Sequence, residues 1–581
     1  MAYGGLFFCK NQRAMQGLCH APCQIVGKHA LSAHDTAADG GAIAFASGRL
    51  RNAHELAQTL AENGASAPCD TDLAGLILGA YRLWGDRYAE HLHGPIISGI
   101  IDRDANLMLI SRDRMGELPL FYTYRSGSMA FASHPHILLD SCASSRIVDR
   151  DGLGEIFGIG PAKTPGMTPF RDIKTLEPGM LLIADAHGHK LRRYFALEAH
   201  EHEHDEVRTI REVRNLVAQS VEDVRALNPA IMLSGGLDSC VLTALMANGR
   251  SEPLHTWSVD YVDSAKYFSG NQFHIARDQP FIEEAVTHFG TTHQQIVLDS
   301  STLAEGLDEA MRLRGFPGMG DIDSSLMAFA QVIGQTHRYV LSGECGDEVF
   351  GGYPWFMSEE MIWSDGFPWS GSLAFRESIL KKQIRDKLRL GRYVCTRYHE
   401  SICDLPHLAS DSLHEAKLRQ LHGLCFRWFM PNLQERAVRM CAAQNLSVLT
   451  PFCDERLVQY VYNVPWSMKT MRGAEKGLLR MAMQDLLPEA LLWRKKSPYP
   501  KTHHPEYANL MRIRMQKILN DPSSPILDLV DTETVEHLIS TELRAQDTPW
   551  FGQLMAGAQL LSYLIQINEW MLTYRVELDL S

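Results

Sequence analysis

Short stretches in which hydrophobic and polar residues alternate dominate the chain up to about residue 195. Alternation over four to eight residues is typical of a strand that buries one face. We expect strands at residues 95–101, 107–111 and 118–124, the third after a turn at 112–116. Such a run of short strands predicts stacked antiparallel sheets in the first part of the chain.

The pattern changes after a hydrophilic stretch, His-Glu-His-Glu-His-Asp, at residues 200–205. His-rich stretches can bind metal ions, but we interpret this one as a solvated linker, because helical periodicity with charge on one face follows over residues 206–225. Strand-like and helix-like segments then alternate over residues 230–353, which is typical of a doubly wound parallel sheet. Beyond residue 370 the pattern is mostly helical.

These changes divide the chain into a first domain over residues 1–195, a linker over 196–205 and a second domain over 206–581. The length of 581 residues is ample for two or more domains with separate cores. The net charge is −13, from 56 Lys and Arg against 69 Asp and Glu. Since no basic arm or stripe offsets this charge, we expect no nucleic-acid partner.

No apolar run approaches the length of a membrane span, and the N-terminus has no basic region followed by an apolar one. The twelve cysteines are scattered along the chain, as is typical of free thiols in a reducing compartment. We therefore expect a cytoplasmic protein with no membrane partner. Cys19, His20 and Cys23 have metal-like spacing, but without a second paired cluster we do not expect zinc there.

Residues 232–239, Met-Leu-Ser-Gly-Gly-Leu-Asp-Ser, predict an apolar strand that enters a Gly-rich turn and then a helix. Such a turn points backbone N–H groups and a helix N-terminus at a phosphate group. The two glycines allow close approach, the serines offer hydroxyls, and Asp238 can hold a metal ion that bridges phosphates. The segment is not a Walker loop, because the Lys-Ser/Thr ending is missing. A strand-to-helix turn without a ligand is the alternative interpretation.

A second segment, residues 341–353, again follows an apolar strand, at 339–341. It places Glu344, Asp347 and Glu348 around glycines at a strand end, where open parallel sheets bind ligands. Acidic groups near a phosphate loop predict magnesium and a polarised substrate.

Together the two segments resemble the asparagine synthetase superfamily, whose synthetase domain carries an SGGLDS-type pyrophosphate loop and a later SGEGxDExFGGY segment. The likeness continues through residues 451–454, 457–458, 476–480 and 487–488, and it reaches into the first half of the chain. The resemblance implies an α/β protein with an N-terminal Ntn-type αββα sandwich, as in class II glutamine amidotransferases. It also implies a C-terminal doubly wound parallel-sheet ATP-pyrophosphatase domain with a helical C-terminal part.

In activity, the resemblance implies a ligase that uses ATP and Mg²⁺ to adenylate a small-molecule carboxylate or amino acid, releasing PPi, and then joins it to an amine with release of AMP. Lys476 matches the family lysine that stabilises charge on phosphate, and Glu344 matches the glutamate near the incoming nitrogen. Magnesium would use Asp238 and Asp347. The implied ATP-binding residues are Leu233, Ser234, Gly235, Gly236, Leu237, Asp238, Ser239, Ser258, Val259 and Gly343. The implied substrate-binding residues are Asp321, Asp323, Ser324, Glu348 and Arg480.

The first domain departs from the family pattern. Glutamine-dependent members begin Met-Cys-Gly, whereas this sequence begins Met1-Ala2-Tyr3, and Cys9 lies too far along to become N-terminal without a specific cleavage. Arg49 stands where the family has an acidic residue that grips the ammonium group of glutamine. We expect a degenerate domain with a glutaminase-like fold and no glutaminase activity. Action of Cys9 after processing is the alternative.

The resemblance also implies a possible homodimer, which is ordinary for the family. Three hypotheses follow for the function of the whole chain. The first is intramolecular lactam formation in a specialised pathway, as in β-lactam synthetases, which also lack the N-terminal cysteine. Known β-lactam synthetases, however, resemble one another in having a tyrosine at the position of Glu344, so an ammonia-dependent amide synthetase is a close alternative. A non-catalytic nucleotide-binding relative is the third. Leu449 replaces an arginine of many members, which puts aspartate in doubt as the substrate.

Overall fold

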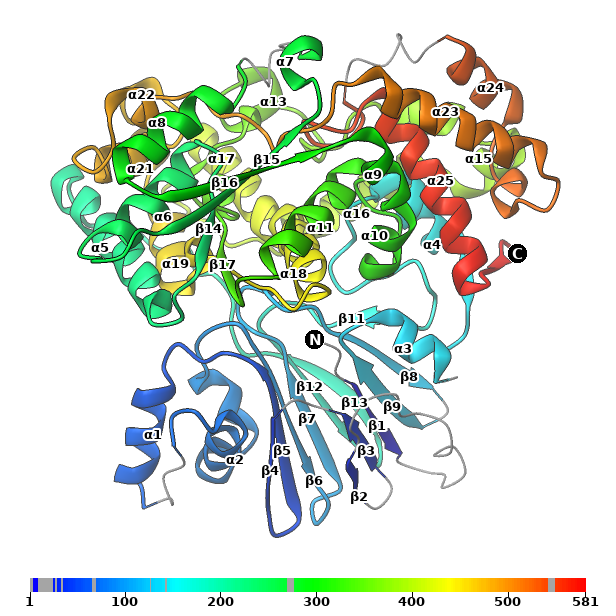
Figure 1. The fold of residues 1–581 in the computed structure, drawn as a ribbon. Helices are drawn as coiled ribbons and strands as arrows, with labels where there is room; N and C mark the ends of the chain where they lie inside the picture. The colour runs from blue at the N-terminus through cyan, green and yellow to red at the C-terminus, as the bar shows by residue number, and fades with distance from the viewer. Residues whose placement is uncertain are drawn as a thin grey trace. The chain divides into compact units, whose positions relative to one another are not determined.

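The computed structural model describes two compact units of the chain (Figure 1). The described residues are 4–8, 24–26 and 29–32, for which only the backbone is considered, and 35–64, 69–125, 127–141, 144–268, 276–541 and 549–581. The first unit comprises Met1–Gly152, Thr164–Leu197 and Val576–Ser581, and the second comprises Leu153–Lys163 and Glu198–Arg575.

These units differ from the predicted domains in two places, and hydrogen bonds explain both. In the first unit, β19 (Glu577–Asp579) pairs in parallel with β10 (Ile147–Asp149). In the second unit, the Tyr563 hydroxyl donates a 2.7 Å hydrogen bond to the carbonyl of Ile156. Segments far from each other in the sequence therefore complete each unit.

Two six-stranded antiparallel sheets form the first unit, in the orders β13-β12-β7-β6-β5-β4 and β11-β8-β9-β1-β3-β2. Two predicted strands are confirmed by β6 (Ile96–Asp102) and β7 (Leu107–Ser111), and the third by β8 (Phe121–Arg125), which begins three residues later than predicted. The other strands are β1 (Gly4–Phe8), β2 (Gln24–Val26), β3 (His29–Ser32), β4 (Asp35–Asp39), β5 (Ala42–Gly48), β9 (Ser128–Ala132), β11 (Lys174–Thr175), β12 (Met180–Asp185) and β13 (Gly188–Arg193).

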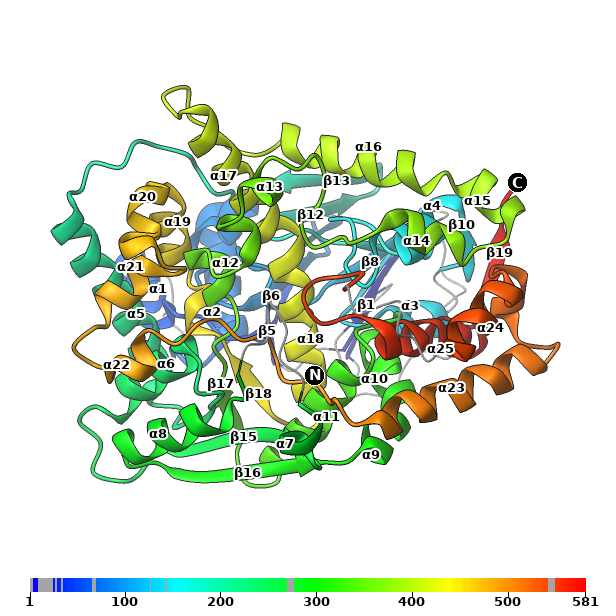
Figure 2. The ribbon, with the colours of Figure 1, turned by 90° about the horizontal axis from the view of Figure 1, so that it is seen from above.

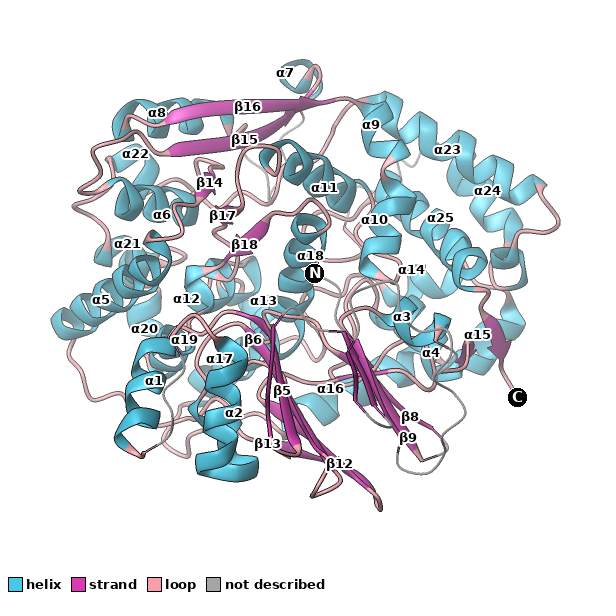
Figure 3. Ribbon diagram, turned by 60° about the horizontal axis from the view of Figure 1, so that its bottom comes forward, coloured by secondary structure: helices cyan, strands magenta, loops and turns pink. Residues whose placement is uncertain are grey.

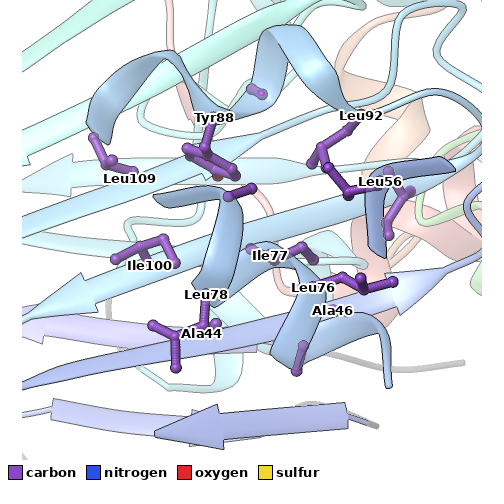
Figure 4. Close-up of a cluster of buried hydrophobic side chains, with 14 of the residues drawn as sticks. Ala44, Ala46, Leu56, Leu76, Ile77, Leu78, Tyr88, Leu92, Ile100 and Leu109 are labelled. Atoms are coloured by element: carbon purple, nitrogen blue, oxygen red, sulfur yellow. The ribbon is translucent and has the colours of Figure 1, made fainter. Parts of the chain in front are cut away.

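Strand β5 is buried on both faces because it lies between two hydrophobic cores. Its larger residues, Ile43 and Phe45, pack in the core between the sheets, where the rings of Phe45 and Phe131 stack with centroids 5.2 Å apart. Its alanines face a second core against α1 (Ala53–Glu62) and α2 (Leu73–Trp84), shown in Figure 4. Small side chains on that face let the helices pack closely on the sheet.

A five-stranded parallel sheet forms the centre of the second unit, in the order β16-β15-β14-β17-β18. Figure 3 shows α6 and α8 on one side of this sheet and α11 and α18 on the other, so the sheet is doubly wound as predicted. The strands are β14 (Ala230–Met232), β15 (His255–Tyr261), β16 (Thr292–Leu298), β17 (Tyr339–Leu341) and β18 (Ser447–Leu449). The helices named are α6 (Leu237–Ala247), α8 (Gln279–Phe289), α11 (Asp321–Ile333) and α18 (Met430–Ala442).

Helices make up most of the chain after residue 370, as predicted, and Figure 2 shows α23 (Pro505–Asn520) and α25 (Gly557–Tyr574) side by side. Helix α5 (Glu206–Arg225) has the predicted bounds, with the Asp205 carboxylate accepting a hydrogen bond from the N–H of Arg208. Among the described helices, none is both long and apolar enough to cross a lipid bilayer.

The His-rich segment before α5 is exposed or half-exposed, and two of its residues bond to a neighbouring helix. The N–H of His200 donates to Asn463 Oδ1 at 2.8 Å, and His204 Nδ1 lies 2.8 Å from the Tyr460 hydroxyl. Both partners belong to α19 (Glu455–Asn463). The segment therefore lies along a helix of the second unit.

Candidate active site

The parallel sheet reverses its strand order between β14 and β17, which are its first and fourth strands along the chain. In open α/β sheets, ligands bind at such a point, outside the carboxyl ends of the strands. The segments that follow these two strands, 233–239 and 342–347, are those for which the sequence predicts a phosphate and metal site. Both segments line one cavity of the second unit.

Most of the predicted site residues line this cavity. These residues are Leu233, Ser234, Gly236, Leu237, Asp238, Ser239, Ser258, Val259, Gly343, Glu344, Asp347, Lys476 and Arg480. Of the other predicted residues, all of them described, Gly235, Asp321, Asp323, Ser324 and Glu348 lie outside its lining.

Glycines bring the loops of the cavity into close contact. Gly235 has φ of +66°, and a Cβ there would lie 2.8 Å from the backbone nitrogen of Ile282. A Cβ on Gly343 would lie 2.9 Å from Cβ of Asp238, and one on Gly346 would lie 2.6 Å from Oδ1 of Asp238. Gly235 and Gly343 leave no room for a side chain, and a side chain at Gly346 would displace the Asp238 carboxylate.

Serine hydroxyls hold the loop that precedes α6. Ser234 Oγ accepts a 3.3 Å hydrogen bond from the N–H of Gly236, and Ser239 Oγ accepts a 3.2 Å bond from the N–H of Ser234. Helix α6 follows Gly236, which has no side chain to cap the helix. The first N–H groups of α6 therefore face the cavity in the arrangement that suits an anion.

Two lysines and two carboxylates form a charged cluster beside this loop. Lys476 Nζ lies 2.5 Å from Asp238 Oδ2 and 2.6 Å from Asp347 Oδ1, and Lys496 Nζ lies 2.6 Å from Asp347 Oδ2. Lys476 has φ of +55°, an unfavourable conformation for a residue with a Cβ. Such backbone strain is typical of functional positions. The cluster thus joins the two predicted loops to the segments that carry the lysines.

The two carboxylates fit a magnesium ion. Asp238 Oδ1 is buried and has no hydrogen-bond partner among the described residues. A buried, unpaired carboxylate oxygen is costly, and magnesium is a preferred partner of carboxylate oxygens. Elsewhere in the described residues, no group of three or more His, Cys, Asp or Glu side chains is arranged to hold a metal. Cys19, His20 and Cys23 lie outside the described residues.

The cluster also separates the pKa values of its two carboxyl groups. Burial would raise the pKa of Asp347, but the ammonium groups of Lys476 and Lys496 outweigh burial and lower this pKa to about 2. Burial raises the pKa of Asp238, against the attraction of Lys476 and with the repulsion of Asp347. A cation bound between the two groups would stabilise the ionised form of both.

Glu344 shares the cavity with Arg436, which the sequence analysis missed. Arg436 NH1 lies 3.6 Å from Glu344 Oε1, and the Glu344 side chain is 23% exposed. Burial raises the pKa of Glu344, and the charge of Arg436 opposes this rise. The Arg436 guanidinium lies over the ring of Tyr499, 4.7 Å from its centroid. An isolated arginine in a helix carries no sequence signal, so only the fold could identify Arg436.

Asp323 acts behind Arg436 rather than in the cavity. It is fully buried and accepts a 3.0 Å hydrogen bond from Arg436 Nε and a 2.8 Å bond from the N–H of Met319. Asp321 accepts from Gln559 Nε2 at 3.1 Å, and burial raises its pKa to about 6. The hydroxyl of Ser324 bonds within its own helical turn, to the carbonyl of Gly320.

Glu348 is likewise buried beneath the site. It accepts a 2.5 Å hydrogen bond from the Tyr353 hydroxyl, and burial followed by the charge of Asp347 raises its pKa to about 8. His422 Nε2 lies 2.9 Å from the carbonyl oxygen of Glu348, so this residue is held from two sides. Glu348 therefore holds the segment that carries Asp347 and does not line the cavity.

Basic residues from the segments after residue 470 close the cavity. Arg480 donates to Glu475 Oε1 at 2.9 Å and to the carbonyl of Leu492, and it lines the cavity. Arg494 donates to the carbonyl of Ser234 at 2.9 Å and pairs with Asp278. This arginine belongs to the basic stretch at 494–503 and ties it to the phosphate loop.

Ser258 and Val259 lie in the middle of β15 and line the same cavity. The Ser258 hydroxyl lies 3.0 Å from His293 Nε2, and Thr256 Oγ1 lies 3.0 Å from the other ring nitrogen. Burial lowers the pKa of His293, so the ring is neutral near pH 7. The partly apolar surface that Val259 gives the cavity suits the flat face of a heterocycle.

The glycine loop and the charged cluster line one cavity at the switch point of a doubly wound sheet. Comparisons with known proteins identify the family. Residues 212–572 match the model of the asparagine synthase family, and residues 10–195 match that of the glutamine amidotransferase domain. The glutamine-hydrolyzing asparagine synthetase 3 of Bacillus subtilis is 39% identical over 539 residues, which are 92% of this chain and 87% of that protein.

More distant relatives carry the same description. The glutamine-hydrolyzing asparagine synthetase 1 of Bacillus subtilis is 24% identical, over 78% of this chain and 74% of that protein. The glutamine-hydrolyzing asparagine synthetase B of Escherichia coli is 21% identical, over 73% of this chain and 64% of that protein.

The chain belongs to the asparagine synthetase family. It is an asparagine synthetase-like, ATP-dependent amide synthetase, and its homologues are AMP-forming ligases. This family uses ATP, usually with Mg²⁺, and small-molecule substrates are consistent with it. The resemblance noted in the sequence is therefore confirmed, as is the combination of an Ntn-type and a parallel-sheet fold.

Proposed function

We propose that the chain adenylates a carboxylate, with release of PPi, and then joins it to an amine that its own N-terminal unit does not release from glutamine. One observation carries the adenylation step. The cluster of Lys476, Lys496, Asp238 and Asp347 lies directly beside a glycine loop whose N–H groups face the same cavity. This combination supplies donors and cations for a triphosphate and ligands for its metal ion.

The residues of the cluster would act mainly by holding charge. Magnesium, held by Asp238 and Asp347, would spread the negative charge of the phosphates when bound. Lys476 would shift part of its pairing from the two aspartates to the phosphate that departs. The N–H groups at the start of α6 and the hydroxyls of Ser234 and Ser239 would hold the pyrophosphate in place.

Glu344 would accept the proton of the attacking amine. Its carboxylate lines the cavity beside Arg436, whose NH1 lies 3.6 Å from Glu344 Oε1. The guanidinium opposes the rise in the pKa of Glu344 that burial causes, because a positive charge near a carboxyl group favours the charged form. A base that is ionised near pH 7 can take a proton from an ammonium group as the amide bond forms.

The nitrogen source is the finer part of this proposal. Arg49 is cationic where the family resemblance places an acidic residue for glutamine, and this residue supports a donor other than glutamine. In our preferred form the amine belongs to the same molecule as the carboxylate, and the product is a lactam. Glu344 favours a second candidate, an ammonia-dependent amide synthetase, because this glutamate is typical of amide-forming members of the family.

AMP and PPi release from the purified full chain would separate these forms. The assay takes ATP, magnesium and a panel of carboxylates with and without an amine of their own, each with no nitrogen donor, with ammonium or with glutamine. Release with an amine-bearing carboxylate alone supports the lactam form, and strict dependence on ammonium supports the second candidate. Turnover that depends on glutamine would refute the proposal for the N-terminal unit.

A further inference from the structure

Beside Glu344, part of the cavity wall consists mainly of apolar side chains, with Gln553 as a polar neighbour, and we call this part the apolar chamber. Its residues are Tyr353, Phe429, Leu433, Gly552 and Leu554, all of which line the cavity. The rings of Tyr353 and Phe429 lie 5.2 Å apart in an edge-to-face arrangement. A Cβ on Gly552 would lie 3.9 Å from Cζ of Phe429, so the segment around residue 552 lies in contact with this ring.

The apolar chamber adjoins the proposed reaction centre on two sides. Leu433 and Arg436 are three residues apart on α18 and therefore lie on one face of that helix, with Arg436 next to Glu344. On the other side, Tyr353 follows Gly352, at which a Cβ would lie 2.0 Å from Asp347 Oδ1. A carboxylate held at the lysine cluster therefore has its attached group close to the chamber.

Cations near the chamber already bond to other groups of the chain. Lys501 Nζ donates a 3.1 Å hydrogen bond to the carbonyl of Leu554. Arg436, the cation next to Leu433, is paired with Asp323 and Glu344. Lys476 and Lys496 are paired with the two aspartates and are needed at the phosphates. Aspartate keeps one carboxylate after the other is activated, and burial of that group without a cation is costly.

We propose that the apolar chamber selects a carboxylate substrate that carries an aromatic or large aliphatic group, in place of aspartate. The inference rests on the proposed function, because the chamber is part of the same cavity. Leu449, which stands in place of the arginine of many family members, agrees with it. Aromatic and aliphatic walls favour such a group because its transfer from water is favourable.

Calorimetric binding to the full chain tests the chamber directly. The probes are 3-phenylpropanoate and succinate. They have one carboxylate in common, and the first carries a phenyl ring where the second carries another carboxylate. We expect the wild-type chain to bind 3-phenylpropanoate at least tenfold more tightly. Leu433→Lys places a cation in the chamber and should reverse this preference, whereas the volume-conserving Leu433→Met should keep it. Equal or tighter binding of succinate by the wild-type chain, or an unchanged preference in Leu433→Lys, would overturn the inference.

ATP–PPi exchange with phenylalanine, 3-phenylpropanoate and aspartate separates this inference from the proposed function. Exchange that is at least tenfold faster with the ring-bearing compounds supports both. Exchange that is fastest with aspartate overturns the chamber and leaves adenylation in place. A binding preference for the ring together with no exchange on any compound supports the chamber and overturns the proposed function.

Discussion

Replacement of Arg436 by methionine tests whether this arginine keeps Glu344 ionised. The charged atoms are 3.6 Å apart. Coulomb's law at this distance gives about 1 kcal/mol for an effective dielectric constant of ~80 and about 5 kcal/mol for ~20. Since Glu344 is partly exposed, we take the lower part of this range, roughly 1–2 kcal/mol, which corresponds to about a five- to thirtyfold change in the ionisation equilibrium.

The sign of the effect follows from the loss of a positive charge. Without Arg436 the pKa of Glu344 rises, so the carboxylate form that accepts a proton requires a higher pH. We expect the rate of amide formation by Arg436→Met to fall about tenfold on the acidic side of the pH profile and to recover as pH rises. Arg436→Lys keeps a charge and should keep most of the wild-type profile.

A pH profile of single-turnover amide formation, started from ATP and the carboxylate, measures this effect. Arg436 also pairs with the buried carboxylate of Asp323, so Arg436→Met removes one partner of Asp323. Arg314, whose NH1 lies 3.7 Å from Asp323 Oδ2, remains as a second partner. Thermal unfolding of both variants therefore serves as the folding control. Arg439→Met, on the same helix and paired with Glu435, should leave the acidic limb unchanged. Identical profiles for the wild-type chain and folded Arg436→Met would refute the assignment of Glu344 as the base.

Three further changes have distinct outcomes. Gly352→Ala would place a Cβ 2.0 Å from Asp347 Oδ1 and 2.2 Å from Lys476 Cε, so we expect at least a tenfold loss of ATP–PPi exchange. Gly366→Ala is the control, because a Cβ there would meet nothing within 4 Å, and its exchange rate should equal that of the wild-type chain. Equal exchange rates for the two variants would contradict the placement of the cluster. Arg389 is exposed and has φ of +48°, a conformation that glycine adopts without strain, so Arg389→Gly should stabilise the second unit by about 0.5–1 kcal/mol in urea unfolding. Arg385→Gly, inside α15 (Lys382–Leu388), should destabilise the second unit by a similar amount, because glycine is unfavourable within a helix. Despite its burial, Glu435 has a pKa lowered by Lys163 and Arg439, so its contribution to stability is present above the ordinary glutamate pKa, about 4.3, and is lost as pH falls below it. Unfolding of Glu435→Gln against wild type from pH 3 to 7 should therefore show a difference that shrinks toward low pH, and a constant difference would argue against the charge.

The sequence predicted the parts of the fold that have long or repeated patterns. Helix α5 has 20 residues with an uninterrupted charged face, and its bounds were predicted correctly. The three-residue strand β18 was not predicted, because a segment of this length inside a helical region has no period of its own. Its place in the sheet depends on backbone pairing with β17, which is a tertiary contact.

The predicted site shows the same division. The glycine loop and the Asp-Glu segment are local motifs, so the residues that line the cavity could be named from the sequence. Glu348 belongs to the Asp-Glu segment and Asp323 lies in α11, but the chain buries them behind Tyr353 and Arg436. Arg436 and Tyr499 come from separate segments and meet only in the folded chain.

The pairing of β19 with β10 has a consequence for biosynthesis. Arg171 joins the two strands through Asp579 at 2.6 Å and Asp149 at 3.0 Å, so the first unit holds its final strand by both backbone and charge. This strand follows the whole of Glu198–Arg575 in the sequence, and a ribosome makes it after the second unit. The first unit therefore completes its fold only after the second has been synthesised. A chain cut between residues 197 and 576 would leave a first unit in which β10 has lost its partner β19 and exposes an unpaired edge.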